Sequence, residues 1–210
     1  MMKPLTIQIV CPARAGTQHG NRVTALRWCR MLRELGHRPV VVDAWTERAC
    51  DVLLALHASK SAPSIAGFRQ TYPEGRLIVA LTGTDLYRDF ESNAAQRSIR
   101  MADQLVVLQP EALRKLSRTS RRKTAVIFQS VQPLRVVRPA TPRRLRVVVA
   151  GHLRALEDPL RPALAARQLP SRSRIVIQHF GGVLEHQWKS RVEAEMKRNS
   201  RYLWFGERTR

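Results

Sequence analysis

Cysteine is scarce in this sequence, and long apolar runs are missing from it. The three cysteines, Cys11, Cys29 and Cys50, are an odd number without C-x-x-C spacing, so neither a disulfide framework nor a zinc site is expected. No apolar run approaches the ~20 residues that a membrane-spanning helix needs, and the polar first residues do not resemble a signal peptide. These absences, with an ordinary apolar content of 44%, predict a globular protein of the cytoplasm.

Acidic residues are also few, and lysine is rarer still. The chain has 37 basic and 16 acidic residues, a formal net charge of +21 at pH 7, and only six of the basic residues are Lys. Such a charge favours polyanions as partners, and residues 114–123 and 135–146 are dense basic clusters. Because neither cluster has interleaved aromatics and no helix-turn-helix or zinc-finger pattern occurs, no specific nucleic acid is expected. Binding to nucleic acid or to an anionic surface is kept as the second alternative function.

What is present is a regular alternation of apolar strands with amphipathic helices. Strands are expected at residues 6–10, 38–42, 51–56, 77–81, 104–108 and 124–128, and helices at residues 22–35, 64–72, 89–101 and from Pro110 onward. The helix at residues 22–35 has an apolar stripe that runs from Ala25 to Leu35. The regular alternation of strands and helices predicts an α/β fold. In it, a Rossmann-like, doubly wound parallel sheet forms a first domain over residues 1–131.

A second α/β pattern begins after residues 132–143, which are rich in Pro and Arg, lack periodicity and read as a linker. Strands are expected at residues 145–150, 174–180 and 202–205, with helices at residues 159–168 and 185–199. Residues 144–210 therefore predict a second Rossmann-like sheet, with about half the elements of a full one. The expected organisation is two domains, of which the second is incomplete.

The strand at residues 77–81 marks a candidate site. Its five apolar residues fit a strand buried on both faces, and it ends in Thr82-Gly83-Thr84-Asp85. Ligands of open α/β sheets bind beyond the carboxyl ends of the strands, and His57 follows the strand at residues 51–56. In the alternative interpretation Gly83 forms a turn, Asp85 caps the next helix, and His57 is a packed or solvated residue.

The first strand is followed by a loop with two glycines and then by a helix, a unit whose helix N-terminus can hold anions. The loop does not match G-x-G-x-x-G, so a dinucleotide fingerprint is absent. No residues have metal-ligand spacing, and no metal is expected.

Six short motifs occur in an order and spacing that resemble one protein family. They are residues 20–28 (GNRVTALRW), 35–37 (LGH), 55–58 (ALHA), 80–88 (ALTGTDLYR), 105–110 (LVVLQP) and 151–154 (GHLR). With the two successive α/β domains, they resemble the selenosugar synthases of selenoneine biosynthesis, which are GT-B glycosyltransferase-like enzymes. The resemblance extends over about residues 6–206. It implies a GT-B fold and transfer of a sugar from a UDP-sugar to selenophosphate, with no cofactor besides the UDP-sugar substrate.

The resemblance also implies roles for particular residues. In the N-terminal domain, His57 and Asp85 would be catalytic. The acceptor anion would be bound there by Gly20, Asn21, Arg22, Thr82, Gly83 and Thr84. In the C-terminal domain, the donor phosphates would be bound by Gly151, His152 and Arg154.

Two departures from the family pattern concern the donor side. Glu157 stands where the resembling enzymes commonly carry Lys, and a carboxylate there would repel a diphosphate. The acidic motif and the glycine-rich helix N-terminus that bind the donor in GT-B enzymes do not occur within these 210 residues. The first alternative is therefore a truncated, catalytically inactive homologue. An incomplete sheet also predicts self-association through the C-terminal domain.

Overall fold

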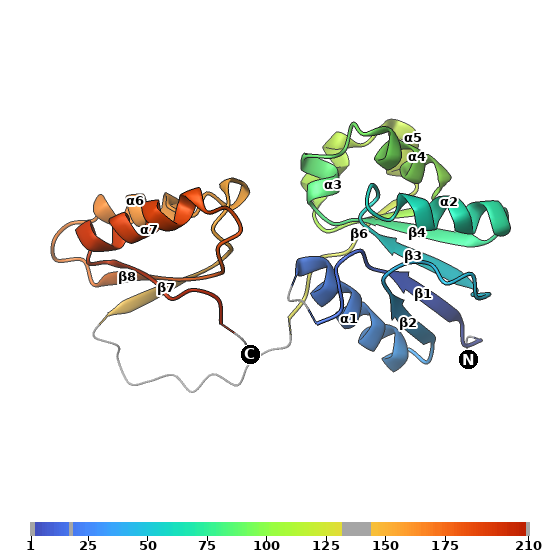
Figure 1. The fold of residues 1–210 in the computed structure, drawn as a ribbon, viewed down its shortest axis with the longest axis horizontal. Helices are drawn as coiled ribbons and strands as arrows, with labels where there is room; N and C mark the ends of the chain where they lie inside the picture. Colours follow the sequence, from blue (N-terminus) through green and yellow to red (C-terminus); the bar gives the residue numbers. More distant parts are fainter. Residues whose placement is uncertain (1–2, 17–18, 132–143, 209–210) are drawn as a thin grey trace. The chain divides into compact units, whose positions relative to one another are not determined.

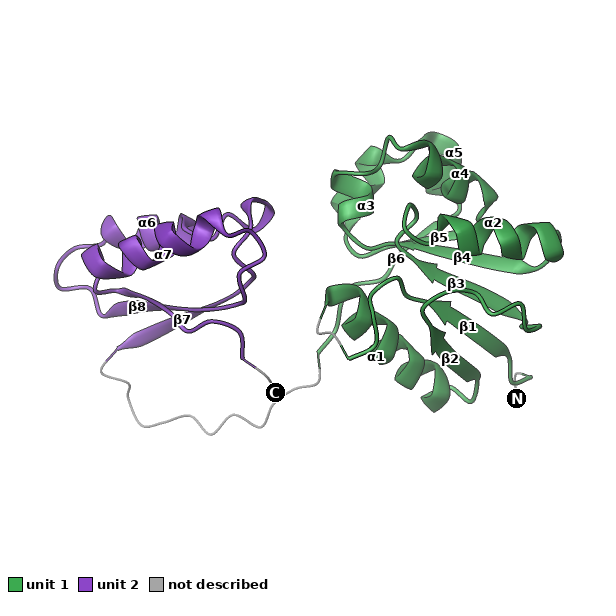
Figure 2. Ribbon diagram, viewed as in Figure 1, with its two compact units in different colours: residues 1–133 green, residues 134–210 purple. Residues whose placement is uncertain are grey.

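The structure, a computed structural model, describes residues 3–16, 19–131 and 144–208 and divides into two compact units (Figure 2). Unit 1 is Met1–Pro133 and unit 2 is Leu134–Arg210. The predicted linker, residues 132–143, lies outside the described residues.

Unit 1 is built on a six-stranded sheet whose neighbouring strands are all parallel, in the order β2-β1-β3-β4-β5-β6 (Figure 1). The strands are β1 (Thr6–Val10), β2 (Arg38–Val42), β3 (Val52–Leu56), β4 (Arg76–Leu81), β5 (Gln104–Val107) and β6 (Thr124–Val126). The helices are α1 (Gly20–Glu34), α2 (Ala62–Thr71), α3 (Thr84–Tyr87), α4 (Asn93–Met101), the 3-10 helix η1 (Pro110–Lys115) and α5 (Arg118–Arg122).

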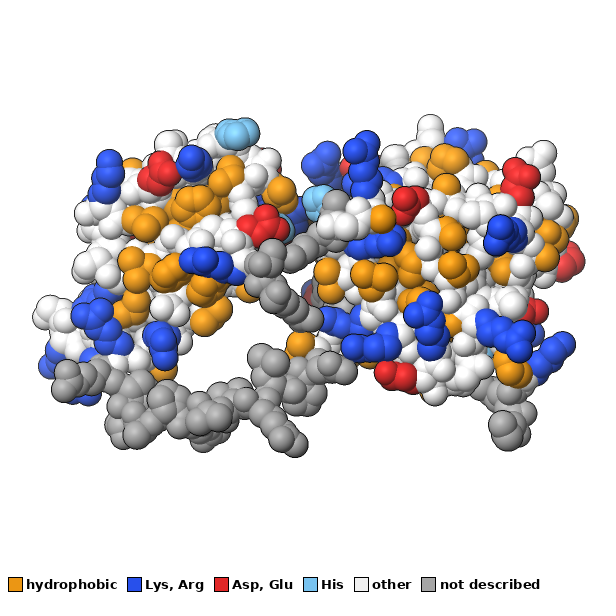
Figure 3. All heavy atoms as spheres, turned by 60° about the horizontal axis from the view of Figure 1, so that its bottom comes forward, with side chains coloured by type: hydrophobic (Ala, Val, Ile, Leu, Met, Phe, Trp, Pro, Cys, Tyr) orange, Lys and Arg blue, Asp and Glu red, His pale blue; other side chains and the backbone are white. Residues whose placement is uncertain are grey.

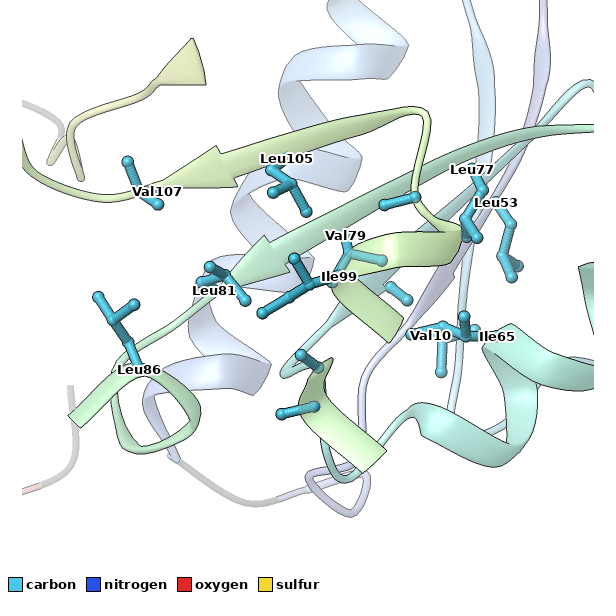
Figure 4. Packing of buried hydrophobic residues seen from close by; sticks show 14 of the residues in the cluster. Val10, Leu53, Ile65, Leu77, Val79, Leu81, Leu86, Ile99, Leu105 and Val107 are labelled. Carbon is cyan, nitrogen blue, oxygen red and sulfur yellow. The ribbon is translucent and has the colours of Figure 1, made fainter. Parts of the chain in front are cut away.

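The sheet of unit 1 is buried on both faces because its strands alternate between two apolar clusters. Leu77, Val79 and Leu81 of β4 pack in the cluster that includes Ile65 of α2 and Ile99 of α4 (Figure 4). The intervening β4 residues pack in a second cluster with residues of α1. Helices thus cover opposite faces, and the predicted doubly wound parallel sheet is confirmed.

Unit 2 is a three-stranded parallel sheet in the order β7-β8-β9. It consists of β7 (Leu145–Ala150), the 3-10 helix η2 (Ala155–Glu157), α6 (Arg161–Arg167), β8 (Ile175–Phe180), α7 (Gln187–Arg198) and β9 (Tyr202–Trp204). Both α-helices lie on one face (Figure 1), where Leu153, Ile177 and Val192 join one core. The two parallel sheets, of six and three strands, confirm the predicted α/β class and the smaller second sheet.

The other face of the unit 2 sheet is open among the described residues. Val148 of β7 is 61% exposed, and Leu203 and Phe205 are also exposed. Figure 3 shows hydrophobic side chains gathered on this side of unit 2, with Lys and Arg side chains beside them. Within residues 144–208, both outer strands, β7 and β9, pair only with β8.

The structure corrects several expected element boundaries. The helix expected at residues 89–101 begins only at Asn93, because the hydroxyl of Ser92 accepts from the N–H of Ala95 and caps it. The short helices α3 and α5 were not expected. Leu35, the last residue of the predicted apolar stripe, is 72% exposed since α1 ends before it.

Candidate functional site

The strand order of unit 1 places a candidate site at the carboxyl ends of β1 and β3. The chain winds from β1 to β2 on one side and from β3 to β6 on the other, so the order reverses between β1 and β3. Such a switch point is where open α/β sheets bind ligands. The loop from Cys11 leaves the end of β1, and His57 follows β3 directly.

His57 is a buried side chain with both ring nitrogens engaged. Its Nε2 lies 2.9 Å from Oγ1 of Thr84, and its Nδ1 lies 3.3 Å from the backbone N of Lys60 and 3.3 Å from Oγ of Ser59. Its φ of 71° is in the left-handed region, which is costly for a residue other than Gly. Burial lowers the pKa of His57, so the ring is neutral at pH 7.

Asp85 ties the ends of β3 and β4 together. Its Oδ1 accepts from the N–H groups of Thr82 and Gly83, both at 2.9 Å, and its Oδ2 accepts from the N–H of Ala58 at 2.9 Å. The carboxyl is fully buried. Asp85 is not the cap of the next helix, because Gly83 occupies that position, with a φ of 133° that requires Gly.

This arrangement fixes what the Thr82–Thr84 turn can offer a ligand. The backbone N–H groups of Thr82 and Gly83 are bound by Asp85 and are not available to an anion. The side-chain oxygen of Thr82 is shielded and has no partner among the described residues. Among the described residues, the hydroxyl of Thr84 bonds only with His57 and that of Thr82 with no group, so both hydroxyls can still form hydrogen bonds. The catalytic roles of His57 and Asp85 stay predictions.

Arg22 lies in the first turn of α1 but turns toward the strands. Its Nη1 is 3.4 Å from Oδ1 of Asp43, which follows β2, and its Nε is shielded without a partner among the described residues. Arg22 also lowers the pKa of the Cys11 thiol, although burial raises that pKa overall. Gly20 and Asn21 begin α1, and His19 before them makes no side-chain capping hydrogen bond. In the part of the chain that the structure describes, no hydrogen bond joins these residues to the His57–Asp85 group.

The candidate donor residues lie where the chain leaves β7 and β8 in unit 2. The N–H of Gly151 donates to the carbonyl of Phe180 at 2.9 Å, and Nδ1 of His152 accepts from the N–H of Gly182 at 3.0 Å. A Cβ at Gly181 would lie 1.8 Å from the carbonyl oxygen of Gly151. The two segments therefore approach so closely that only Gly fits at position 181.

Arg154 and Glu157 form an ion pair next to this crossing. Nε of Arg154 donates to Oε1 of Glu157 at 3.2 Å, and Nη2 donates to the same oxygen. The other carboxylate oxygen of Glu157 would lie 3.6 Å from a Cβ at Gly151, so the carboxylate lies close to the turn after β7. Glu157 would therefore act against a donor diphosphate in two ways. Its charge would repel the diphosphate, as expected, and it also neutralises Arg154, the residue expected to bind the diphosphate.

The sequence analysis did not single out His179 and Tyr202, which form a hydrogen-bonded chain to the backbone just after β7. Nε2 of His179 donates to the carbonyl of Gly151 at 2.9 Å, and Nδ1 accepts from the Tyr202 hydroxyl at 2.7 Å. Burial lowers the pKa of His179 and raises the pKa of Tyr202. The sequence contained one sign of this role, because His179 is a polar residue within the apolar run at residues 174–180.

The described residues contain no group of three or more His, Cys, Asp or Glu that could hold a metal ion. No helix among them is long and apolar enough to cross a membrane. The basic cluster at residues 114–123 falls on η1, α5 and their flanks. Most of the cluster at residues 135–146 lies outside the described residues.

No protein-family model matches the chain, and a search of curated proteins gave no significant match. Among solved structures, the chain is similar to HepE of Anabaena in complex with UDP-glucose, with a TM-score of 0.59 and 12% identity, covering 98% of this chain and 70% of that one. It is also similar to the apo form of the lipopolysaccharide outer core galactosyltransferase WaaB, with a TM-score of 0.58 and 12% identity, covering 97% of this chain and 68% of that one. The chain therefore has a GT-B-like fold.

Proposed function

We propose that the protein transfers a sugar from a nucleotide-sugar donor to an acceptor. One observation carries this proposal: nearly the whole chain is similar in fold to HepE, whose structure contains UDP-glucose. The chain is similar in fold to the galactosyltransferase WaaB over nearly its whole length as well. UDP-sugars are the donors that we infer from these neighbours.

The proposed acceptor is selenophosphate, which the sequence resemblance implies. In the proposed reaction a selenium lone pair attacks the anomeric carbon and forms the carbon–selenium bond. The bond from that carbon to the diphosphate oxygen breaks, and UDP leaves with the electron pair. Arg154 and the turn at Gly151 and His152 would stabilise the charge that develops on the diphosphate. Gly20, Asn21, Arg22 and the Thr82–Thr84 turn would bind the acceptor, and His57 and Asp85 would lie beside it.

The two alternative functions are those of an inactive glycosyltransferase homologue and of a basic protein that binds polyanions. The structural neighbours favour neither. A cytoplasmic location agrees with the proposed use of UDP-sugars and stays a proposal. We also propose that the open face of the β7-β8-β9 sheet, defined by Val148, Leu203 and Phe205, mediates self-association, because it is apolar and uncovered among the described residues.

The experiment that tests the function is an assay of UDP release from UDP-GlcNAc and other UDP-sugars, with selenophosphate as acceptor and ⁷⁷Se NMR to detect the carbon–selenium bond. We expect release that depends on the acceptor and is lost in Arg154→Ala. Arg161→Ala is the matched control, because Arg161 is an exposed arginine of unit 2 that pairs with Asp158 instead. A folded chain that releases no UDP with any of these donors would overturn the proposal.

A further inference from the structure

His57 and Thr84 form a pair that fixes the direction of one hydroxyl group at the unit 1 site. Nδ1 of His57 lies 3.3 Å from the backbone N–H of Lys60. A backbone N–H can only donate, so Nδ1 is the acceptor and the proton of a neutral ring is on Nε2. Nε2 lies 2.9 Å from Oγ1 of Thr84. The ring therefore donates and the Thr84 oxygen accepts, which leaves the hydroxyl hydrogen of Thr84 to donate elsewhere.

The charged groups around the ring agree with a neutral imidazole. Asp85 and Asp89, from the segment after β4, raise the pKa of His57, and Lys60, from the segment after β3, lowers it. Burial is the largest effect and lowers the pKa below its ordinary value of 6.5. The carboxylate of Asp85 is satisfied by three backbone N–H groups and does not reach the imidazole nitrogens by any hydrogen bond of the described residues.

The hydroxyl hydrogen of Thr84 has no acceptor among the described residues, because the bond with His57 is the one hydrogen bond that the side chain makes there. Close by in the chain, the hydroxyl of Thr82 is shielded and also unpartnered. The N–H groups of Thr82 and Gly83 are bound by Asp85. The hydroxyl of Thr84 is thus a donor without an acceptor at the end of β4, and the shielded hydroxyl of Thr82 lies two residues before it in the chain.

We propose that Thr84 donates its hydroxyl hydrogen to an oxygen of a compact oxyanion bound in unit 1, and that His57 is a positioning residue that orients this hydroxyl. His57 is then not the general base, since its accepting nitrogen is occupied and its other nitrogen carries a proton. The identification of the anion as the acceptor substrate rests on the proposed function. The hydrogen bonds of His57 and Thr84 are independent of that function.

The first test needs no activity. Long-range ¹H–¹⁵N correlation spectra of the full chain, labelled at histidine, report the tautomer of each imidazole. At pH 7 we expect His57 to be protonated at Nε2 alone, with a midpoint of titration below 6.5. A proton on Nδ1, or a charged ring at pH 7, would overturn the assignment of His57 as the donor to Thr84.

The second test uses inorganic phosphate as the probe, titrated into the full chain by calorimetry. Thr84→Val removes the hydroxyl at nearly constant shape and should weaken phosphate binding about tenfold or more, while Thr84→Ser should retain it. His57→Gln, which keeps an N–H donor near the position of Nε2, should bind phosphate more tightly than His57→Ala.

Each result of this titration decides the proposal. Absence of phosphate binding to the wild type, or equal binding by folded Thr84→Val, would overturn it. A failure of the proposed glycosyl transfer can be told apart from a failure of this proposal. A chain that binds phosphate through Thr84 but releases no UDP from any UDP-sugar would have the anion site without the activity.

Discussion

Arg154 and Glu157 are the residues whose contact bears most directly on the proposed donor site. Arg154 gives both Nε and Nη2 to one oxygen of Glu157, so a diphosphate would have to compete with a carboxylate for the same guanidinium. Both side chains are partly exposed, 30% and 38%, and solvent screening makes such a pair weak. Glu157 would therefore reduce affinity for a diphosphate without abolishing it.

The first prediction follows from this competition. Glu157→Gln removes the competing charge and should raise the affinity of the chain for UDP roughly fivefold, and Glu157→Lys should raise it further. Calorimetric titration of UDP measures both, and Glu193→Gln, on the exposed face of α7, is the control for net charge. An affinity that stays the same or falls in Glu157→Gln would show that Glu157 does not compete for Arg154.

The second residue-scale prediction concerns Gly181. A methyl group there would meet the backbone of Gly151, carbonyl oxygen and carbon at 1.8 and 2.5 Å, which cannot yield as a flexible side chain would. Gly181→Ala should therefore destabilise unit 2 by about 2–3 kcal/mol. Hydrogen exchange of the amides of β8 in the full chain would measure the loss.

Gly151→Ala is the matched control for Gly181→Ala, because its new Cβ would meet only the side chain of Glu157, at 3.6 Å. It should leave the exchange of β8 nearly unchanged. Equal protection of β8 in both variants would contradict the close crossing of the two segments.

At the scale of elements, the strands could be predicted almost residue by residue and the loops could not. β1, β2 and β7 have the expected bounds, because an apolar run between polar breaks is typical of a parallel strand. Asp85 was identified as notable, but its partners lie on two different loops, which no local pattern encodes. His179 was missed for the same reason, since its partners are Gly151 and Tyr202.

The two buried histidines give the third prediction, on pH. The folded chain resists protonation of His57 and His179, whose pKa values burial lowers, while the unfolded chain takes up protons near pH 6.5. The unfolded state therefore binds more protons as the pH falls, so stability should be constant above about pH 7 and should decrease from pH 6.5 toward about pH 5.

Urea unfolding of the full chain at several pH values measures this decrease. The slope should be reduced in His57→Gln and reduced further when His179→Gln is added, whereas His186→Gln, at the start of α7, should not change it. Stability that rises on acidification over this range would contradict neutral, buried histidines.

At the scale of the whole molecule, the open face of unit 2 governs the fourth prediction. Val148 is 61% exposed on the sheet face away from the helices, and burying such a face stabilises a complex. The full chain should self-associate, and Val148→Glu should shift it to monomer in size-exclusion chromatography with light scattering. Leu164→Glu on α6, a residue 43% exposed on the helical side, is the control. A wild type that is monomeric at all concentrations would contradict this interface.

Binding of a nucleotide-sugar donor is tested most directly by calorimetric titration of UDP and of UDP-GlcNAc into the full chain. We expect micromolar binding that is lost in Arg154→Ala and retained in Arg161→Ala. The absence of binding from a folded sample, or binding that is unchanged in Arg154→Ala, would contradict it.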